Sequence, residues 1–150
     1  MAFQAKITRA RFVLGPFTSE DMETIGNVLV DKIKDRIGKG MNCNDAAARP
    51  LKPGKNGKRG YPDYKAARGL QAIRDWLWTG RTMRSLKVKS ASENRAVIGF
   101  IDPRGDQVAH ANNLREKQFG ISPSDRAALA KIVRALLKVS RSIVQFRRAA

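Results

Sequence analysis

The chain has 150 residues and carries 30 Lys and Arg against 13 Asp and Glu, which gives a formal net charge of +17. This length matches one domain, and a hydrophobic content of 42% suffices for a core, which excludes wholesale disorder. No segment approaches the ~18 consecutive apolar residues of a membrane span, and the first residues lack the apolar run of a signal peptide. We therefore expect a single domain over residues 1–150, no membrane partner, and a protein that stays in the cytoplasm where it is made.

The first two predicted elements are an extended segment and a long helix. Residues 3–13 alternate apolar and polar side chains, so we expect a strand or an extended arm within residues 1–17. Thr18 and Asp21 have the spacing of a capping box, and acidic residues follow in the first turn, where the positive helix end favours them. Apolar residues then recur every three or four positions as far as Gly38, namely Met22, Ile25, Leu29, Ile33 and Ile37. This pattern predicts an amphipathic helix that ends at Gly38.

A long basic loop is predicted for residues 39–62. The segment is rich in Gly and Pro, contains six Lys or Arg, and has no apolar periodicity. A loop of this length is either a solvated, flexible element or an arm that becomes ordered on a partner. A phosphate-cradling loop is a poor alternative, because the stretch PGKNGKRG lacks the GxxxxGK[ST] spacing and follows no strand.

A second helix is predicted to begin after Pro62 and to stop at Thr79-Gly80. Asp63 would cap it, and its apolar side would carry Leu70, Ile73 and Leu77. Two tryptophans thicken this side, Trp76 and Trp78. We interpret them as anchors of the core or of a subunit interface, rather than as a platform for stacking bases.

The next segments predict a β-hairpin and two more helices. The runs RSLKVKS and NRAVIGFI predict paired strands, of which the first wets one face and the second lies more centrally. The chain then turns at residues 102–105, and residues 106–118 predict a short helix. A last helix is predicted over residues 123–146. Ser122 would be its N-cap, Pro123 its first residue, and Asp125 the second member of a capping box.

The last predicted helix has two faces. One is apolar and should pack on the core, and the other is cationic. The apolar arc comprises Leu129, Ile132, Val133, Leu136, Ser140, Ile143 and Val144, and the cationic arc comprises Lys131, Arg134, Lys138 and Arg141. Together these elements predict an α+β fold in which long amphipathic helices pack on a small antiparallel sheet that includes the hairpin.

No residues with the spacing of a catalytic or metal site stand out. A nucleophilic triad needs a base, but the only histidine, His110, lies in an Asn-rich segment, and the only cysteine, Cys43, lies in the Gly/Pro-rich loop. One cysteine cannot form an internal disulfide, and no Cys/His cluster could hold zinc. The carboxylates show no DxD or ExxH spacing. We therefore expect no catalytic, cofactor-binding or metal-binding residues, and a protein that is not an enzyme.

The order of segments resembles the virion morphogenesis and tail completion proteins of tailed bacteriophages, over about residues 19–137. Four motifs carry the resemblance: Thr79-Gly80-Arg81, Ser85-Leu86, Ala111-Asn112-Asn113, and residues 118–126 (QFGISPSDR). The resemblance implies a small α+β structural subunit that assembles as a homo-oligomeric ring, a hexamer or a dodecamer. Such a ring lies at the head-tail junction of the virion (the neck), beside head-tail connector, tail terminator or tail tube proteins.

The charge excess suits either acidic rims on neighbouring ring proteins or passing DNA. We expect the contacts to a partner or polyanion to come from the loop and the last helix, through Lys52, Lys55, Lys58, Arg59, Arg134, Lys138 and Arg141. A subunit contact is expected at the acidic start of the first helix, through Glu20, Asp21 and Glu23. The alternative function is an autonomous basic nucleic-acid-binding module, although no zinc-finger spacing or aromatic RNP-type strand is present.

Overall fold

The structure is a computed structural model that describes residues 17–77 and 79–148, with side chains described as far as residue 137. The expected strand or arm over residues 1–17 lies outside the described residues except for Phe17, which is buried. The α+β fold is confirmed: the described chain forms five helices and a two-stranded antiparallel sheet. These elements are α1 (Ser19–Gly38), α2 (Tyr61–Ala66), α3 (Arg81–Ser85), β1 (Leu86–Ser92), β2 (Arg95–Phe100), α4 (Pro103–Arg115) and α5 (Pro123–Arg148).

The first long helix forms as predicted. The Asp21 amide donates to Thr18 Oγ1 at 3.1 Å, and the Thr18 amide donates to Asp21 Oδ2 at 3.0 Å, so the capping box is complete. The five apolar residues of the predicted stripe are all buried, and Gly38 is the last helical residue. Their burial makes α1 the central element of the core.

The hairpin is confirmed, with Leu86 opposite Phe100 and Ser92 opposite Arg95. A register shift between Val88 and Ser90 leaves an extra residue in β1, which makes a β-bulge. The expectation that the second strand lies centrally is wrong, because the sheet has only two strands in the described chain, and Ile101, just beyond β2, is 54% exposed.

The helix predicted for residues 63–78 is also wrong, because α2 begins at Tyr61 and ends at Ala66. Gly69 has a φ of +69°, and the Leu70 amide donates to the Lys65 carbonyl at 3.0 Å, which closes a Schellman-type turn. Asp63 lies inside the helix and accepts from the Gly60 amide at 2.7 Å. The chain therefore leaves the helical path before the apolar residues that suggested a longer helix.

The predicted helix over residues 106–118 is shifted toward the N-terminus, since α4 spans Pro103–Arg115. The expected turn at residues 102–105 is instead the first turn of this helix. Asp102 is its N-cap and accepts from the amides of Arg104 and Gly105 at 3.3 and 3.2 Å. The short helix α3, which precedes the hairpin, has no counterpart among the expected elements.

The last helix starts as predicted. The Asp125 amide donates to Ser122 Oγ at 3.1 Å and the Ser122 amide donates to Asp125 Oδ2 at 3.0 Å. On the predicted apolar arc, Leu129 and Val133 are buried, whereas Leu136 is half-buried. The helix continues to Arg148, two residues beyond the expected end.

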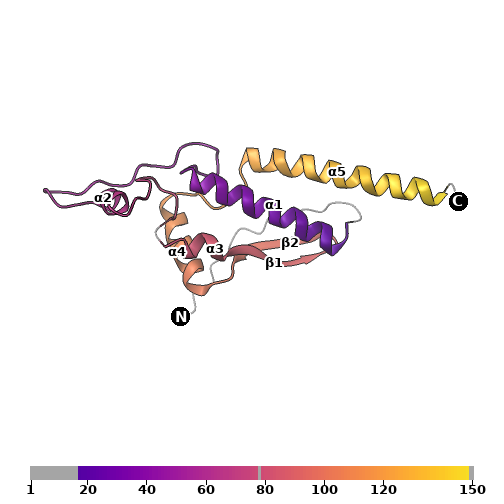
Figure 1. Cartoon of the computed structure of the whole chain (residues 1–150), viewed down its shortest axis with the longest axis horizontal. Coiled ribbons are helices and arrows are strands. Elements are labelled where there is room, and N and C mark those ends of the chain that lie inside the picture. The colour runs from indigo at the N-terminus through magenta and orange to yellow at the C-terminus, as the bar shows by residue number, and fades with distance from the viewer. Residues whose placement is uncertain (1–16, 78, 149–150) are drawn as a thin grey trace.

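The elements form layers around α1, as Figure 1 shows. The hairpin covers one side of α1, and α5 packs on the other side and extends past it. At one end of these layers α3 and α4 pack together, and the segment that contains the basic loop and α2 projects from that end. In the described part of the chain, no helix has both the length and the apolar character that crossing a membrane requires.

Candidate functional site

The predicted contact residues of the loop lie at the projecting end of the molecule (Figure 1). Lys52, Lys55, Lys58 and Arg59 are all exposed. The loop reverses between residues 54 and 60, where a side chain on Gly54 would lie 1.7 Å from the Lys58 carbonyl oxygen, so glycine is required. The reversal places three of these cations at the tip, whereas Lys52 lines a cavity behind it.

The predicted contact residues of α5 do not join the loop cations. Arg134 is exposed on α5, a helix that runs away from the projecting end (Figure 1). The side chains of Lys138 and Arg141 lie outside the described residues. The five predicted cations whose side chains are described therefore do not form one continuous patch.

The acidic start of α1 lies at the end of the molecule opposite the loop (Figure 1). Glu20 and Glu23 are exposed, while Asp21 is half-buried and serves the capping box. Because Arg36 near the end of α1 binds Asp125 at the start of α5, the two helices run antiparallel, and the start of α1 lies beside a later part of α5. Two of the three predicted acidic contact residues are thus free of a capping role.

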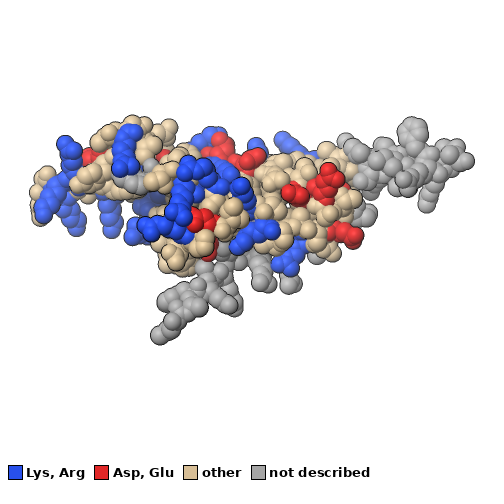
Figure 2. All heavy atoms as spheres, turned by 60° about the horizontal axis from the view of Figure 1, so that its bottom comes forward, with Lys and Arg blue, Asp and Glu red and all other residues tan. Residues whose placement is uncertain are grey.

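A cavity of about 760 Å³ opens between the base of the loop, α2, the segment 73–76, α3 and α4. Seven Lys or Arg side chains line it, against a single carboxylate, Asp75. Basic side chains gather over the loop end of the molecule in Figure 2. The basic lining residues are Arg49, Lys52, Lys65, Arg74, Arg81, Arg104 and Arg115.

Lys65 anchors α2 to the wall of the cavity. Its side chain is 1% exposed, and Nζ binds the Asp75 carboxylate and donates to the Ile73 carbonyl at 2.7 Å. Asp75 also accepts from the Leu77 amide at 2.9 Å. A buried ion pair of this kind is favourable only because further hydrogen bonds satisfy both charged groups. The pair holds a six-residue helix that could not be stable by itself.

Trp76 forms the floor beside this anchor. Its φ of +58° is in the left-handed region, which an ordinary residue occupies only when its surroundings hold it there. The indole Nε1 donates to Gln118 Oε1 at 2.7 Å, and the ring lies 6.2 Å from that of Phe100. The side chain of Trp78 lies outside the described residues. For Trp76 the interpretation as a core anchor is confirmed.

Two tyrosines lie on α2. Tyr61 lines the cavity and is 47% exposed, and Tyr64 is 51% exposed. Residues three apart lie on the same side of a helix, so both side chains belong to the same side of α2. Burial, with a further contribution from the negative charge of Asp75, raises the pKa of Tyr61, which keeps its hydroxyl protonated near neutral pH.

Arg49 and Arg74 form the wall opposite α2. Arg49 Nε lies 3.1 Å from Glu116 Oε2, without the geometry of a hydrogen bond, and Arg74 Nε donates to the Arg49 carbonyl at 3.2 Å. Asn42 Nδ2 donates to Glu116 Oε1 at 3.2 Å. These contacts attach the base of the loop to the rest of the molecule.

The third side of the cavity is made by α3 and α4. The Arg81 guanidinium donates two hydrogen bonds to the Asp102 carboxylate, one of which runs from Nη2 to Oδ1 at 2.9 Å. The hydrogen bond from Arg81 lowers the pKa of Asp102, so the carboxylate that caps α4 stays ionised. Arg104 and Arg115, at opposite ends of α4, are exposed and contribute two further cations.

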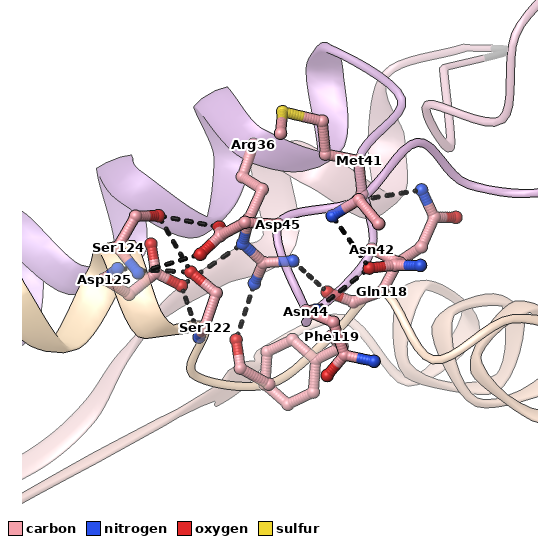
Figure 3. A network of polar contacts seen from close by, with 12 residues as sticks. Arg36, Met41, Asn42, Asn44, Asp45, Gln118, Phe119, Ser122, Ser124 and Asp125 are labelled. Carbon is pink, nitrogen blue, oxygen red and sulfur yellow. Dashed lines mark hydrogen bonds and ion pairs between the residues drawn. The ribbon is translucent and has the colours of Figure 1, made fainter.

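A buried polar network joins the cavity wall to the helices (Figure 3). Arg36 is 4% exposed, and its guanidinium donates to the carbonyls of Gln118 and Gly120 at 2.8 and 2.6 Å and to Asp125 at 3.2 Å. Gln118 is fully buried, and its Nε2 donates to the carbonyls of Met41 and Arg74 at 3.3 and 2.6 Å. One side chain thus joins the loop, the cavity wall and the core.

Residues 41–48 of the predicted loop belong to this network. The Cys43 amide donates to the Lys117 carbonyl at 2.9 Å, and Asp45 accepts from the Ser124 hydroxyl and amide at 2.7 and 2.8 Å. These bonds lower the pKa of Asp45. Met41 also forms a β-bridge with Ala47. The first part of the predicted loop is therefore attached to the rest of the chain, so the expectation of a solvated, flexible element or an arm that becomes ordered on a partner does not hold for residues 41–48.

The motifs that carry the phage resemblance serve the fold. The Gly80 carbonyl accepts from the Arg84 amide within α3, and Ser85 Oγ donates to the Thr82 carbonyl at 2.8 Å. Asn113 Oδ1 accepts from the amides of Gln118 and Phe119 at 2.9 and 2.8 Å, where the chain leaves α4. Residues 118–126 contain both Gln118 and the box that starts α5.

His110 is exposed on α4, and Cys43 is half-buried. Within residues 17–77 and 79–148, no group of three His, Cys, Asp or Glu side chains is placed to hold a metal ion. Comparisons of the chain with protein-family models, with curated proteins and with solved structures found no match.

Of the predicted contact residues, only Lys52 lines the cavity. The sequence-based site prediction missed the other six basic lining residues, which are Arg49, Lys65, Arg74, Arg81, Arg104 and Arg115. They come from the loop, α2, the segment 73–76, α3 and α4, so no local spacing could reveal that they share a cavity. The only signal in the sequence was the charge excess itself.

Proposed function

We propose that this chain is a structural virion protein of a tailed bacteriophage, a tail completion or head-tail joining (neck) subunit, and not an enzyme. It would act as a homo-oligomeric ring at the head-tail junction, assembled in the host cytoplasm. Its neighbours would be head-tail connector, tail terminator or tail tube proteins.

The observation that carries this proposal is the use made of the resembling motifs. Four polar residues of these motifs form internal hydrogen bonds that hold together α1, α4 and α5, namely Asn113, Gln118, Ser122 and Asp125. Residues used in this way support a rigid scaffold and are not available for turnover. A scaffold of this kind suits a protein whose work is to fit between neighbours.

A closed ring needs two different surfaces that complement each other on adjacent copies. We assign one surface to the acidic start of α1, with Glu20 and Glu23 as the contact residues. Asp21 is left out because its carboxylate caps the helix. The chain offers two cationic surfaces as the complement: the side of α5 that carries Arg134, and the loop tip that carries Lys55 and Lys58.

The test is complementation of a phage that lacks this protein. The unchanged chain should restore joined particles, and without it filled heads and separate tails should accumulate. Joined particles formed in its absence would overturn the proposed function. Purified particles should contain the chain in a ring visible by cryo-electron microscopy.

The subunit contact is tested by the double variant Glu20→Lys/Glu23→Lys, which should fold but fail to join heads to tails. The matched control is Glu93→Lys in the hairpin turn, which should complement normally. Restoration by Arg134→Glu would identify α5 as the complement, and restoration by Lys55→Glu/Lys58→Glu would identify the loop. Normal joining by the double variant would remove the acidic start of α1 from the interface.

A further inference from the structure

The cavity between the loop and α4 carries positive charge that the protein itself does not neutralise. Lys65 is paired with Asp75, Arg81 with Asp102, and Arg49 with Glu116. Among the described residues, no carboxylate forms an ion pair with the remaining lining cations, which are Lys52, Arg74, Arg104 and Arg115. A concave surface lined by cations concentrates the positive electrostatic potential and attracts anions.

The positive surface continues from the cavity along the loop. Residues 49–52 form a wall of the cavity, and Lys55, Lys58 and Arg59 follow at the tip, where all three are exposed. No Asp or Glu occurs from residue 46 to residue 62. The row of cations is therefore longer than the cavity, which suits an extended anion with several charges better than a single carboxylate or phosphate.

Aromatic side chains lie beside this row. Tyr61 and Tyr64 are about half-exposed on the same side of α2, and the buried Lys65–Asp75 pair holds that helix in place. Proteins that bind single-stranded nucleic acid combine a cationic groove that follows the backbone with aromatic rings on which bases stack. An acidic peptide would use the cations but would gain little from two tyrosine rings.

We propose that the cavity and the adjoining loop bind a single nucleic-acid strand, with Lys52, Arg104 and Arg115 at the phosphates and the two tyrosines against the bases. The site is concave and has the volume of a short segment, about 760 Å³. Reading the sequence of a duplex would instead require a helix or ribbon that projects into one of its grooves. This inference does not depend on ring formation, and it can be tested on the purified chain.

The test measures binding of a fluorescein-labelled 20-nucleotide DNA strand by fluorescence anisotropy between 50 and 200 mM NaCl. The cavity variant is Lys52→Gln/Arg104→Gln/Arg115→Gln. The control variant, Lys87→Gln/Arg95→Gln/Arg134→Gln, removes three equally exposed cations from β1, β2 and α5 and gives the same net charge.

Loss of three phosphate contacts should weaken binding at least about tenfold at 100 mM salt and should reduce the magnitude of the negative slope of log K against log salt by roughly 2, because each contact contributes about 0.7. The control variant should bind within about threefold of the unchanged chain. Equal losses in the two variants would show that only net charge matters and would overturn the site. Thermal denaturation of both variants establishes that they are folded.

The identity of the anion is tested by Tyr64→Leu and by competition. This variant keeps all the cations, and it should weaken binding of the strand at least about fivefold while leaving binding of the matching duplex unchanged. Poly-glutamate of similar length should compete less well than the unlabelled strand. Equal competition, or an unchanged affinity in Tyr64→Leu, would overturn a nucleic-acid strand in favour of an acidic protein segment.

Discussion

Single buried polar residues join distant parts of this chain. Arg36 lies near the end of α1, and all three of its described hydrogen-bond partners lie in residues 118–125, more than 80 positions away. Gln118 likewise joins the segments around the cavity, since its side-chain amide forms hydrogen bonds with residues 41, 74 and 76. A buried group with several charged or amide partners is costly to lose, because its partners stay buried without hydrogen bonds.

We expect Arg36→Gln to lower the free energy of unfolding by about 3–5 kcal/mol, because it leaves the Asp125 charge buried without its cation. Urea denaturation followed by circular dichroism measures this. The matched control, Lys32→Gln, changes an exposed cation on the same helix and should cost less than about 0.5 kcal/mol. Equal losses in the two variants would contradict a structural role for the pair.

A pH-dependent contribution is expected from Asp102. The hydrogen bond from Arg81 lowers the pKa of Asp102 in the folded state below its ordinary value of 3.8. The ionised carboxylate therefore stabilises the fold above about pH 3.8, and this contribution is lost as the pH falls through the lowered pKa.

The difference in Tm between the unchanged chain and Asp102→Asn should accordingly be constant from pH 5 to pH 7 and shrink below pH 3.8. Differential scanning calorimetry at several pH values tests this. Asp31→Asn, on the exposed side of α1, provides the baseline. A difference that grows on acidification would show that the sign is wrong.

At the scale of elements, burial differs along the described part of the apolar arc of α5. Leu129 is 5% exposed, Val133 is 9% exposed and Leu136 is only half-buried in the single chain. The periodicity of the sequence treats these positions alike, because it records spacing and not the distance to α1. Residues that share one sequence pattern can therefore differ in how much each stabilises the fold, and their burial in the structure shows which contribute most.

We expect Leu129→Ala to cost about 2–5 kcal/mol, as for a well-packed core leucine, whereas Leu136→Ala should cost about 1 kcal/mol. Chemical denaturation of the isolated chain gives both values. Arg134→Ala, exposed on the same helix, serves as the control and should be nearly neutral. A larger loss at Leu136 than at Leu129 would mean that the packed half of α5 is misassigned.

The basic loop consists of two parts with different expected dynamics. The amides of residues 42, 43 and 48 donate to backbone carbonyls within or beyond the loop. Within residues 52–59, the one described backbone hydrogen bond runs from the Lys58 amide to the Lys55 carbonyl. Hydrogen exchange should thus be at least about tenfold slower in residues 41–48 than in residues 52–59. Uniformly fast exchange would restore the expectation of one mobile segment, and uniform protection would show that the tip is packed too.

At the scale of the whole molecule, charge is distributed unevenly. The loop end carries the cationic cavity and tip, and the opposite end carries the acidic start of α1 (Figures 1 and 2). A net charge of +17 on 150 residues also repels itself within each copy. This arrangement favours association with an anionic partner, which would relieve the repulsion.

We expect the Tm to rise as NaCl increases from about 20 to 300 mM, because salt screens the repulsion over a Debye length of ~10 Å or less. Scanning calorimetry in NaCl, and in KCl as a control for specific ion effects, measures the change. A Tm that stays flat or falls would show that attractive ion pairs outweigh the charge excess.

The elements whose signals are local could be predicted from the sequence. Thr18 with Asp21, and Ser122 with Asp125, mark the starts of α1 and α5 because each capping box lies within four consecutive residues. The alternation at residues 86–89 and the apolar run at residues 96–101 likewise predicted the hairpin, and these elements together led to the α+β class. The contact residues proposed from the sequence were chosen because they are basic. The sequence did not show which basic residues come together in the folded chain.

The end of α2 and the set of cations that share a cavity depend on contacts between distant segments. The apolar spacing after Asp63 suggested a long helix, but the buried Lys65–Asp75 pair and the turn at Gly69 outweigh that weak periodicity. The cavity takes its cations from segments between residues 49 and 115. Their proximity depends on long-range contacts such as those of Gln118, and pairings between distant residues leave no periodic pattern in the sequence.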